Sequence, residues 1–195
     1  MLTIAIVLFP DAEELDWAGP WEVLGFWSLH FPSDEVSVRT VAPSLDPVRC
    51  AKGLRVLPDE TWDSLGPVDV LVFPGGMGTR RLLNDEPLLE RLRGLHAAGT
   101  LMTSVCTGSL VYAAAGLLRD LPATTHWAAF DELTRADPSI KPDPDSRFVD
   151  TGQVITAAGV SAGIDMALHL VARLHSPDRA REVRRGIQYD PDPPV

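Results

Sequence analysis

Short apolar runs separated by amphipathic stretches are the main pattern of the chain. Residues 2–9, 68–73 and 100–105 are rich in Val, Ile, Leu and Phe, as in strands of a parallel sheet that are covered on both faces. Between these runs, residues 20–27 and 85–98 carry apolar side chains at helical spacing, each with a proline in the expected first turn. This alternation predicts an α/β fold with a mostly parallel sheet.

Shorter elements complete the pattern. Residues 35–41 alternate as a strand does, and residues 48–57 and 148–156 each predict a hairpin. The other expected elements, in chain order, are a loop over 11–19, a short strand within 117–127, a helix over 127–135, an exposed loop over 137–145 and a long last helix entered through 157–165. The proline-rich tail, residues 189–195, cannot continue a helix, and we expect it to pack as an extended arm.

Cys106 stands at a corner between a strand and a helix. The apolar run ends at this cysteine, and Thr107, Gly108 and Ser109 then open an Ala-rich stretch. A strand, a sharp turn and a helix in this order form a nucleophile elbow, in which the helix N-terminus points N–H groups at the raised side chain. The helix dipole can lower the pKa of such a thiol, so no neighbouring histidine is required. From this local pattern alone, a small buried hydrophobe at a strand end is an equally good interpretation.

Other candidate residues also follow predicted strands, at the edge where open α/β sheets bind ligands. Asp16 follows the first strand, and Gly75 with Gly76 follows the strand over 68–73. Paired glycines allow backbone N–H groups to approach a ligand closely. The plain alternatives are a helix-capping aspartate and a strand-to-helix turn that needs positive φ. His126 could act as a base for Cys106, although a lone histidine is more often structural.

The composition of the chain mainly excludes certain partners, cysteine-based sites and membrane segments. The 195 residues carry a formal net charge of −10, which disfavours nucleic acid and anionic membranes as partners and also keeps a protein in solution. The two cysteines, Cys50 and Cys106, form neither a disulfide framework nor a metal quartet. The first residues lack the basic start of a signal peptide, and no apolar run is long enough to span a bilayer. We expect one cytoplasmic domain over 1–195, without a metal or other cofactor.

Several motifs together resemble the ThiJ/PfpI superfamily, and in particular its isocyanide hydratase branch. They cover essentially the whole chain and are residues 15–20 (LDWAGP), 74–76 (PGG), 104–109 (SVCTGS), 123–127 (ATTHW) and 159–165 (GVSAGID). The resemblance implies a flavodoxin-like three-layer α/β/α sandwich, a cysteine nucleophile elbow and a homodimer. Most superfamily members carry glutamate where Asp16 stands, and protease-like members carry histidine where Thr107 stands, so the chain departs from both patterns.

The resemblance implies hydration of a small isocyanide to an N-substituted formamide. Cys106 is the expected nucleophile, which attacks the terminal carbon to give a thioimidate that water then hydrolyses while the nitrogen is protonated. Asp16 is the expected proton donor or water activator, provided that burial raises its pKa enough to keep it protonated. The Thr107 hydroxyl is expected to orient the acid or the water. The residues expected to bind the substrate or the charge on the intermediate are Gly75, Gly76 and Val160.

Three other functions are compatible with the same motifs. Similar motifs occur in sensor domains that precede a helix-turn-helix module in transcriptional regulators, where the site binds without turnover; since the sequence ends at Val195, we expect no such module here. Glyoxalase-like or deglycase-like chemistry on reactive carbonyls is the second alternative, and Asp16 in place of glutamate disfavours it. Redox sensing by Cys106 is the third, because an exposed low-pKa thiolate oxidises readily.

Overall fold

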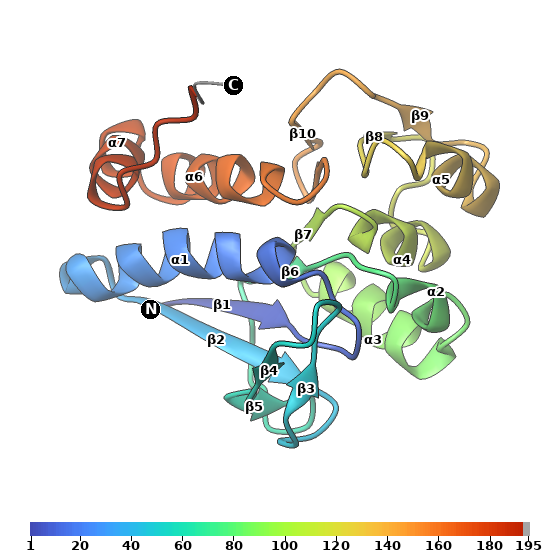
Figure 1. The fold of residues 1–195 in the computed structure, drawn as a ribbon, viewed down its shortest axis with the longest axis horizontal. Helices are drawn as coiled ribbons and strands as arrows, with labels where there is room; N and C mark the ends of the chain where they lie inside the picture. Colours follow the sequence, from blue (N-terminus) through green and yellow to red (C-terminus); the bar gives the residue numbers. More distant parts are fainter. Residues whose placement is uncertain (193–195) are drawn as a thin grey trace.

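The computed structural model describes residues 1–192, which are arranged around one seven-stranded sheet (Figure 1). The strand order is β10-β11-β7-β6-β1-β2-β5, and neighbouring strands are parallel except for β10, which is antiparallel to β11. The strands are β1 (Leu2–Val7), β2 (Val36–Ala42), β5 (Glu60–Thr61), β6 (Val70–Phe73), β7 (Leu101–Val105), β10 (Phe148–Asp150) and β11 (Val154–Ala157). This topology confirms the predicted mostly parallel sheet.

Helices cover both faces of the sheet. Those on one face lie on the left of Figure 1, with α6 and α7 above α1, and are α1 (Glu14–His30), α6 (Ala162–Leu174) and α7 (Pro177–Gly186). Those gathered on the other side are α2 (Thr79–Leu82), α3 (Glu86–Ala97), α4 (Gly108–Ala114) and α5 (Phe130–Ala136). The result is the predicted α/β/α sandwich.

Smaller elements lie outside this sheet. A 3-10 turn, Pro32–Asp34, follows α1. The hairpin predicted over 48–57 is confirmed as β3 (Val48–Arg49) paired with β4 (Arg55–Val56). The short strand predicted within 117–127 is β8 (Pro122–Ala123), which pairs in parallel with β9 (Lys141–Pro142).

The core lies between the sheet and its helices. Ile4, Leu71 and Met102 on three neighbouring strands are fully buried, as expected where helices cover both faces of a parallel sheet. Gly163 allows α6 to approach closely, because a Cβ at this position would lie only 3.1 Å from the side chain of Val105 and 3.2 Å from Pro20. The absence of a side chain at Gly163 therefore determines how closely α6 can approach α1 and β7.

The first helix begins earlier than predicted. The loop expected over 11–19 is wrong from residue 14 onward, because α1 begins at Glu14 and contains Pro20 in its interior. Proline cannot donate the N–H that would bond the carbonyl four residues earlier, which costs a helix stability. Packing of α1 against α6 compensates, since most helical stability in proteins comes from tertiary contacts. Asp16 consequently lies in the first turn of a helix.

Two later helices also differ from the predictions. The helix expected over 127–135 begins only at Phe130, because the N–H groups of Ala128 and Ala129 bond to His126 instead. The last helix is interrupted at Ser176, whose hydroxyl accepts from an N–H in the first turn of α7. A proline directly after this serine suits the start of a new helix rather than the continuation of the old one.

The C-terminal arm is described only in part. Of the tail expected to be extended, residues 193–195 lie outside the described residues, and Tyr189 donates its hydroxyl to Asp165 at 2.9 Å. Within residues 1–192, none of the helices has both the length and the apolar character that crossing a membrane would require.

Tyr112 tests the packing of α4 against the sheet. Its side chain is fully buried, and its hydroxyl donates a 2.8 Å hydrogen bond to the carbonyl of Thr103 on β7. Because Tyr112→Phe keeps the ring but removes this buried bond, we expect the free energy of unfolding to fall by about 1–3 kcal/mol in urea denaturation. The matched control is Tyr189→Phe, which removes a less buried bond and should cost less than about 1 kcal/mol. Equal losses in both variants would contradict the prediction.

Candidate active site

A cleft of about 600 Å³ at the carboxyl edge of the sheet contains Cys106. It brings together residues far apart in sequence, namely Glu13, Gly76, Thr107, His126, Glu132 and Val160. The apolar part of its wall includes Ala51, Met77 and Ala129. The cleft has the size and the mixed lining that are typical of small-molecule sites.

Cys106 occupies a strained turn that the surrounding backbone holds in place. Its φ is 57°, a left-handed value that is uncommon for a residue with a side chain. Its N–H lies 3.0 Å from the carbonyls of Ala157 and Ala158. Its own carbonyl accepts hydroxyl hydrogen bonds from Ser109 and Thr125, both at 3.0 Å. These contacts on both sides offset the strain and present the thiol as a nucleophile elbow does.

Asp16 reaches the same place from α1. It is fully buried, its Oδ2 accepts the N–H of Gly75 at 2.9 Å, and its Oδ1 has no hydrogen bond of ordinary geometry. Burial, and secondarily the charge of Glu13, raise the pKa of Asp16 to about 7, although the Gly75 N–H and the Cys106 thiol act in the opposite direction. The helix-capping interpretation is wrong, because Glu13 is the N-cap residue of α1. The carboxyl can therefore both hold and release a proton near neutral pH.

The thiol shows the opposite pKa direction from the one that the helix dipole predicts. Burial, followed by the negative charge of Asp16, raises the pKa of Cys106 to about 12. The N–H groups of Thr107 and Val160 and the Thr107 hydroxyl lower it, but they do not outweigh the burial. The resting site thus holds a protonated thiol beside a carboxyl of higher acidity, and a thiolate must be formed by proton transfer inside the cleft.

The paired glycines position side chains. The N–H of Gly75 is bonded to Asp16, and the N–H of Gly76 donates to Thr107 Oγ1 at 2.9 Å. A Cβ on Gly75 would lie 2.5 Å from the Thr107 nitrogen and 2.8 Å from Asp16 Oδ2, so only glycine fits. The amides that face the sulfur belong instead to Thr107 and Val160. The sequence pattern located the right turn, but its two N–H groups already have partners within the protein.

His126 lines the cleft without contacting the thiol through a hydrogen bond. Its Nδ1 accepts the N–H of Ala128 at 3.2 Å, and its ring packs against Gly159, where a Cβ would lie 2.5 Å from Cδ2. This arrangement gives His126 a role in shaping the wall, and it does not support the histidine as a base for Cys106.

Comparison with known proteins places this site in a family. The model of the DJ-1/PfpI family matches residues 2–173. The chain belongs to the DJ-1/PfpI family. Among its DJ-1/PfpI relatives, an isonitrile hydratase of Pseudomonas putida is 41% identical over 194 residues, which is 99% of this chain and 81% of that protein.

Two further comparisons extend this family assignment. A glutathione-independent glyoxalase of Caenorhabditis elegans is 28% identical over 187 residues, which is 94% of this chain and 95% of that protein. The crystal structure of a ThiJ/PfpI family protein from Pseudomonas syringae is 35% identical, with a TM-score of 0.89, and the match covers 100% of this chain and 77% of that one. The predicted superfamily is confirmed, and the chain is a homologue of isonitrile hydratase.

The DJ-1/PfpI site includes charged residues that no sequence motif predicted. Arg80 on α2 and Glu132 on α5 form an ion pair along the cleft wall. They are 52 positions apart, so no local spacing could indicate the pair. Thr125, which holds the Cys106 carbonyl, was detectable only as part of the stretch 123–127.

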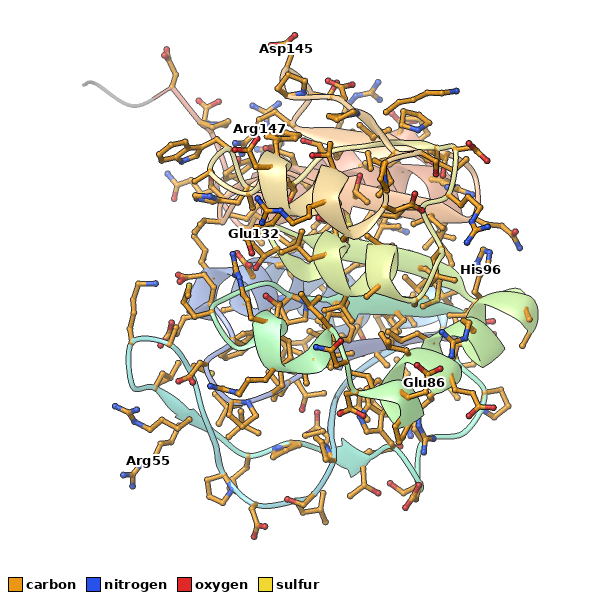
Figure 2. The ribbon with its side chains drawn as sticks, turned by 90° about the vertical axis from the view of Figure 1, so that its right-hand side faces the viewer. Arg55, Glu86, His96, Glu132, Asp145 and Arg147 are labelled. Carbon is orange, nitrogen blue, oxygen red and sulfur yellow. The ribbon has the colours of Figure 1, made fainter. Side chains whose placement is uncertain are left out.

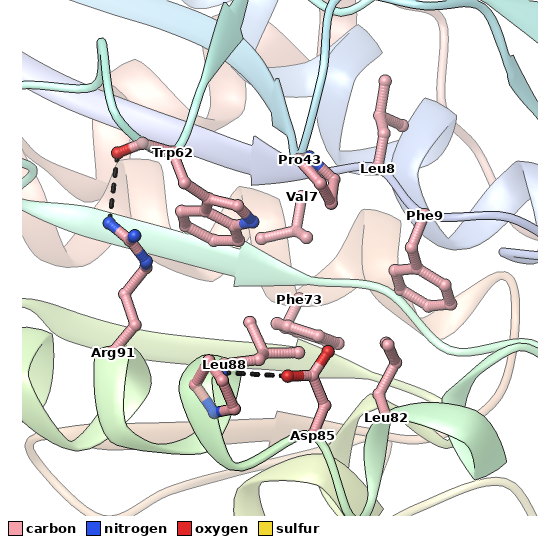
Figure 3. A pocket seen from close by; sticks show the side chains of 11 residues that line it. Val7, Leu8, Phe9, Pro43, Trp62, Phe73, Leu82, Asp85, Leu88 and Arg91 are labelled. Atoms are coloured by element: carbon pink, nitrogen blue, oxygen red, sulfur yellow. Dashed lines mark hydrogen bonds between the residues drawn. The ribbon is translucent and has the colours of Figure 1, made fainter.

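A second, smaller cavity of about 190 Å³ lies beneath the ends of β1 and β6 (Figure 3). Its lining is nearly all apolar, and its two charged side chains are engaged: Asp85 accepts the N–H of Leu88, and Arg91 donates to the carbonyl of Trp62. Within residues 1–192, no group of three His, Cys, Asp or Glu side chains is arranged to hold a metal ion. The candidate chemistry is therefore concentrated in the cleft that contains Cys106.

Asp16 makes the stability of the fold depend on pH. Because its pKa rises from 3.8 to about 7, the folded protein keeps a proton that the unfolded chain loses between these values. The contribution of Asp16 therefore lowers the free energy of unfolding as pH rises from about 4 to about 7, by up to roughly 4 kcal/mol. Above that range its contribution no longer changes with pH. We expect Asp16→Asn to remove this slope in denaturant unfolding measured across the window. The same slope in variant and wild type would show that Asp16 does not carry the proton.

Proposed function

We propose that this protein is an isonitrile hydratase, which converts an isocyanide and water into an N-substituted formamide. The observation that carries the proposal is the Cys106 thiol, held at a strained elbow beside the fully buried Asp16 carboxyl with a pKa of about 7. The 41% identity to the Pseudomonas putida isonitrile hydratase over 99% of the chain supports it.

The first half-reaction forms a covalent bond to the sulfur. The Asp16 carboxylate takes the thiol proton as the sulfur attacks the terminal isocyanide carbon. The attacked carbon then carries a lone pair, which accepts the proton back from Asp16. The product is a thioimidate, R–N=CH–S–Cys106. A carboxyl with a pKa of about 7 suits both transfers, because its acid and base forms are both populated at neutral pH.

The second half-reaction releases the product. Water adds to the thioimidate carbon, and Asp16 accepts one water proton and passes it to the nitrogen, which gives R–NH–CH(OH)–S–Cys106. The C–S bond then breaks and the sulfur leaves with its electron pair. The hydroxyl gives up its proton, which Asp16 passes to the sulfur, and becomes the carbonyl of R–NH–CHO. The N–H groups of Thr107 and Val160 and the Thr107 hydroxyl stabilise the sulfur anion at this step and during its attack.

Glyoxalase-like chemistry on reactive carbonyls is the second candidate. The observation in its favour is the 28% identity to the Caenorhabditis elegans glyoxalase over 94% of the chain. An aspartate at position 16 places the carboxyl one methylene closer to its own backbone than the glutamate of most superfamily members. This departure from the superfamily pattern disfavours glyoxalase-like chemistry for this chain.

We also propose that residues 1–195 form one domain and that the chain forms a homodimer in the cytoplasm. A single hydrophobic core that includes residues of every central strand supports the first statement. Similarity to the superfamily supports the dimer, and Leu29 on α1 offers a 76% exposed apolar side chain for such a contact. The two free cysteines, Cys50 and Cys106, are consistent with a reducing compartment.

Formamide production from an aryl isocyanide, followed by absorbance, tests the proposed reaction. Cys106→Ala should abolish turnover, and Asp16→Asn should lower kcat by about 10²–10⁴-fold because the proton carrier is lost. The matched control is Cys50→Ala, which removes the other buried thiol and should keep turnover within about threefold of wild type. Absence of turnover by the reduced wild type would overturn the proposal, and parallel assays with 2-oxoaldehydes would then separate carbonyl chemistry from binding alone.

Sedimentation velocity tests the dimer. We expect a species of twice the 21.2 kDa chain mass at micromolar concentration. Leu29→Lys should shift the equilibrium toward monomer, because burying an unpaired ammonium in an interface is unfavourable. A single species at the chain mass over the whole concentration range would contradict the proposal.

A further inference from the structure

Arg80 links two walls of the cleft. Its Nε and Nη2 donate to the two carboxylate oxygens of Glu132 at 3.0 and 2.7 Å, which joins α2 to α5. Its Nη1 donates to the carbonyl of Gly76 at 3.2 Å. Since a guanidinium is planar and is held here from two directions, it has one defined orientation. Arg80 therefore connects a distant wall of the cleft to the glycine turn beside the reacting groups.

Several donors compete for the Gly76 carbonyl. The Thr79 hydroxyl donates to it at 2.8 Å and the Thr79 N–H at 3.2 Å, in addition to Arg80. The Thr107 hydroxyl lies 3.2 Å from the same oxygen. A carbonyl oxygen has two lone pairs, so each donor that is already bound disfavours a further one.

The Thr107 hydroxyl has a single hydrogen and three possible acceptors for it. The Gly76 carbonyl lies 3.2 Å away and Thr79 Oγ1 lies 3.3 Å away, and the third acceptor is the Cys106 sulfur, whose pKa the hydroxyl lowers. Arg80 Nη1 donates to both of these oxygens, at 3.2 and 3.3 Å. The position of the Thr107 oxygen itself is fixed, because it accepts the Gly76 N–H at 2.9 Å. Only the direction of the hydrogen is open.

We propose that Arg80 is a positioning residue for the Cys106 thiol: by occupying the Gly76 carbonyl, it directs the Thr107 hydroxyl hydrogen to the sulfur. Glu132 keeps the guanidinium in place, so the ion pair acts on the sulfur through Gly76 and Thr107. The inference deepens the proposed function and rests on one part of it, namely that Cys106 is the nucleophile. It does not depend on which substrate the thiol attacks.

The test measures alkylation of Cys106 by iodoacetamide as a function of pH, in a Cys50→Ala background so that one thiol reacts. Arg80→Met removes the guanidinium, and Arg80→Lys keeps the charge but cannot hold Glu132 and Gly76 together. Both variants should react about tenfold more slowly at neutral pH, with the pH curve displaced by about one unit to higher pH. A wild-type rate in Arg80→Lys would overturn the proposal, because charge alone would then suffice.

A double-variant cycle tests the route through Thr107. In a Thr107→Val background the hydroxyl is absent, so Arg80→Met should cause no further loss of rate. Additive losses would overturn the proposal, since Arg80 would then act by another route. Glu132→Gln keeps the shape of the side chain and should reproduce the Arg80→Lys effect.

The control for a purely structural role is Arg93→Met. This variant breaks an ion pair with Glu86 on α3, and Figure 2 shows Glu86 well separated from Glu132. It should leave the alkylation curve unchanged, and a shift equal to that of Arg80→Met would overturn the proposal. Because alkylation needs no isocyanide, a wild type that makes no formamide but shows these shifts would refute the proposed function while supporting this inference.

Discussion

The buried contact between the Asp16 carboxyl and the Cys106 thiol is the constraint on which the site depends. Burial penalises the charged form of both groups, and the negative charge of Asp16 raises the pKa of Cys106 further, whereas the thiol acts to lower the pKa of Asp16. In the proposed reaction, the proton passes between these two groups inside the cleft. The Gly75 N–H donates to the Asp16 carboxyl, and the N–H groups of Thr107 and Val160 face the Cys106 sulfur. These donors partly replace the hydrogen bonds to water that both groups lose on burial.

The parallel sheet makes this contact possible. Because the carboxyl ends of β1, β6, β7 and β11 meet at one edge, the segments that follow them supply the acid, the glycine turn, the elbow and the Val160 amide. The arrangement carries strain, since Cys106 and Val160 have φ values of 57° and 49°. Such conformations persist only where surrounding structure is firm, and here the adjacent strands are fully buried.

The family as a whole does not determine the reaction. DJ-1/PfpI relatives of this chain include both an isonitrile hydratase and a glyoxalase, so membership of the family is compatible with different reactions. A reaction depends on the site rather than on the fold, and hence on the groups that line the cleft. In this chain those groups include the ion pair of Arg80 with Glu132, which links the cleft wall to the hydroxyl beside the sulfur.

Local sequence determined most of the strands, the hairpins and the cysteine corner, because apolar runs, turn residues and helix signals act over a few neighbouring positions. It did not predict the two-residue strands β5 and β9, which are too short to show a pattern. It also identified Asp16 as a candidate residue through the family motif. The tertiary structure decided the start of α1, which depends on packing against α6, and the raised pKa of Cys106, which depends on burial beside a residue 90 positions away. It likewise decided the partners of the glycine N–H groups and the pairing of Arg80 with Glu132. Burial and pairing between distant segments arise only when the chain has folded, so the spacing of residues along the sequence does not predict them.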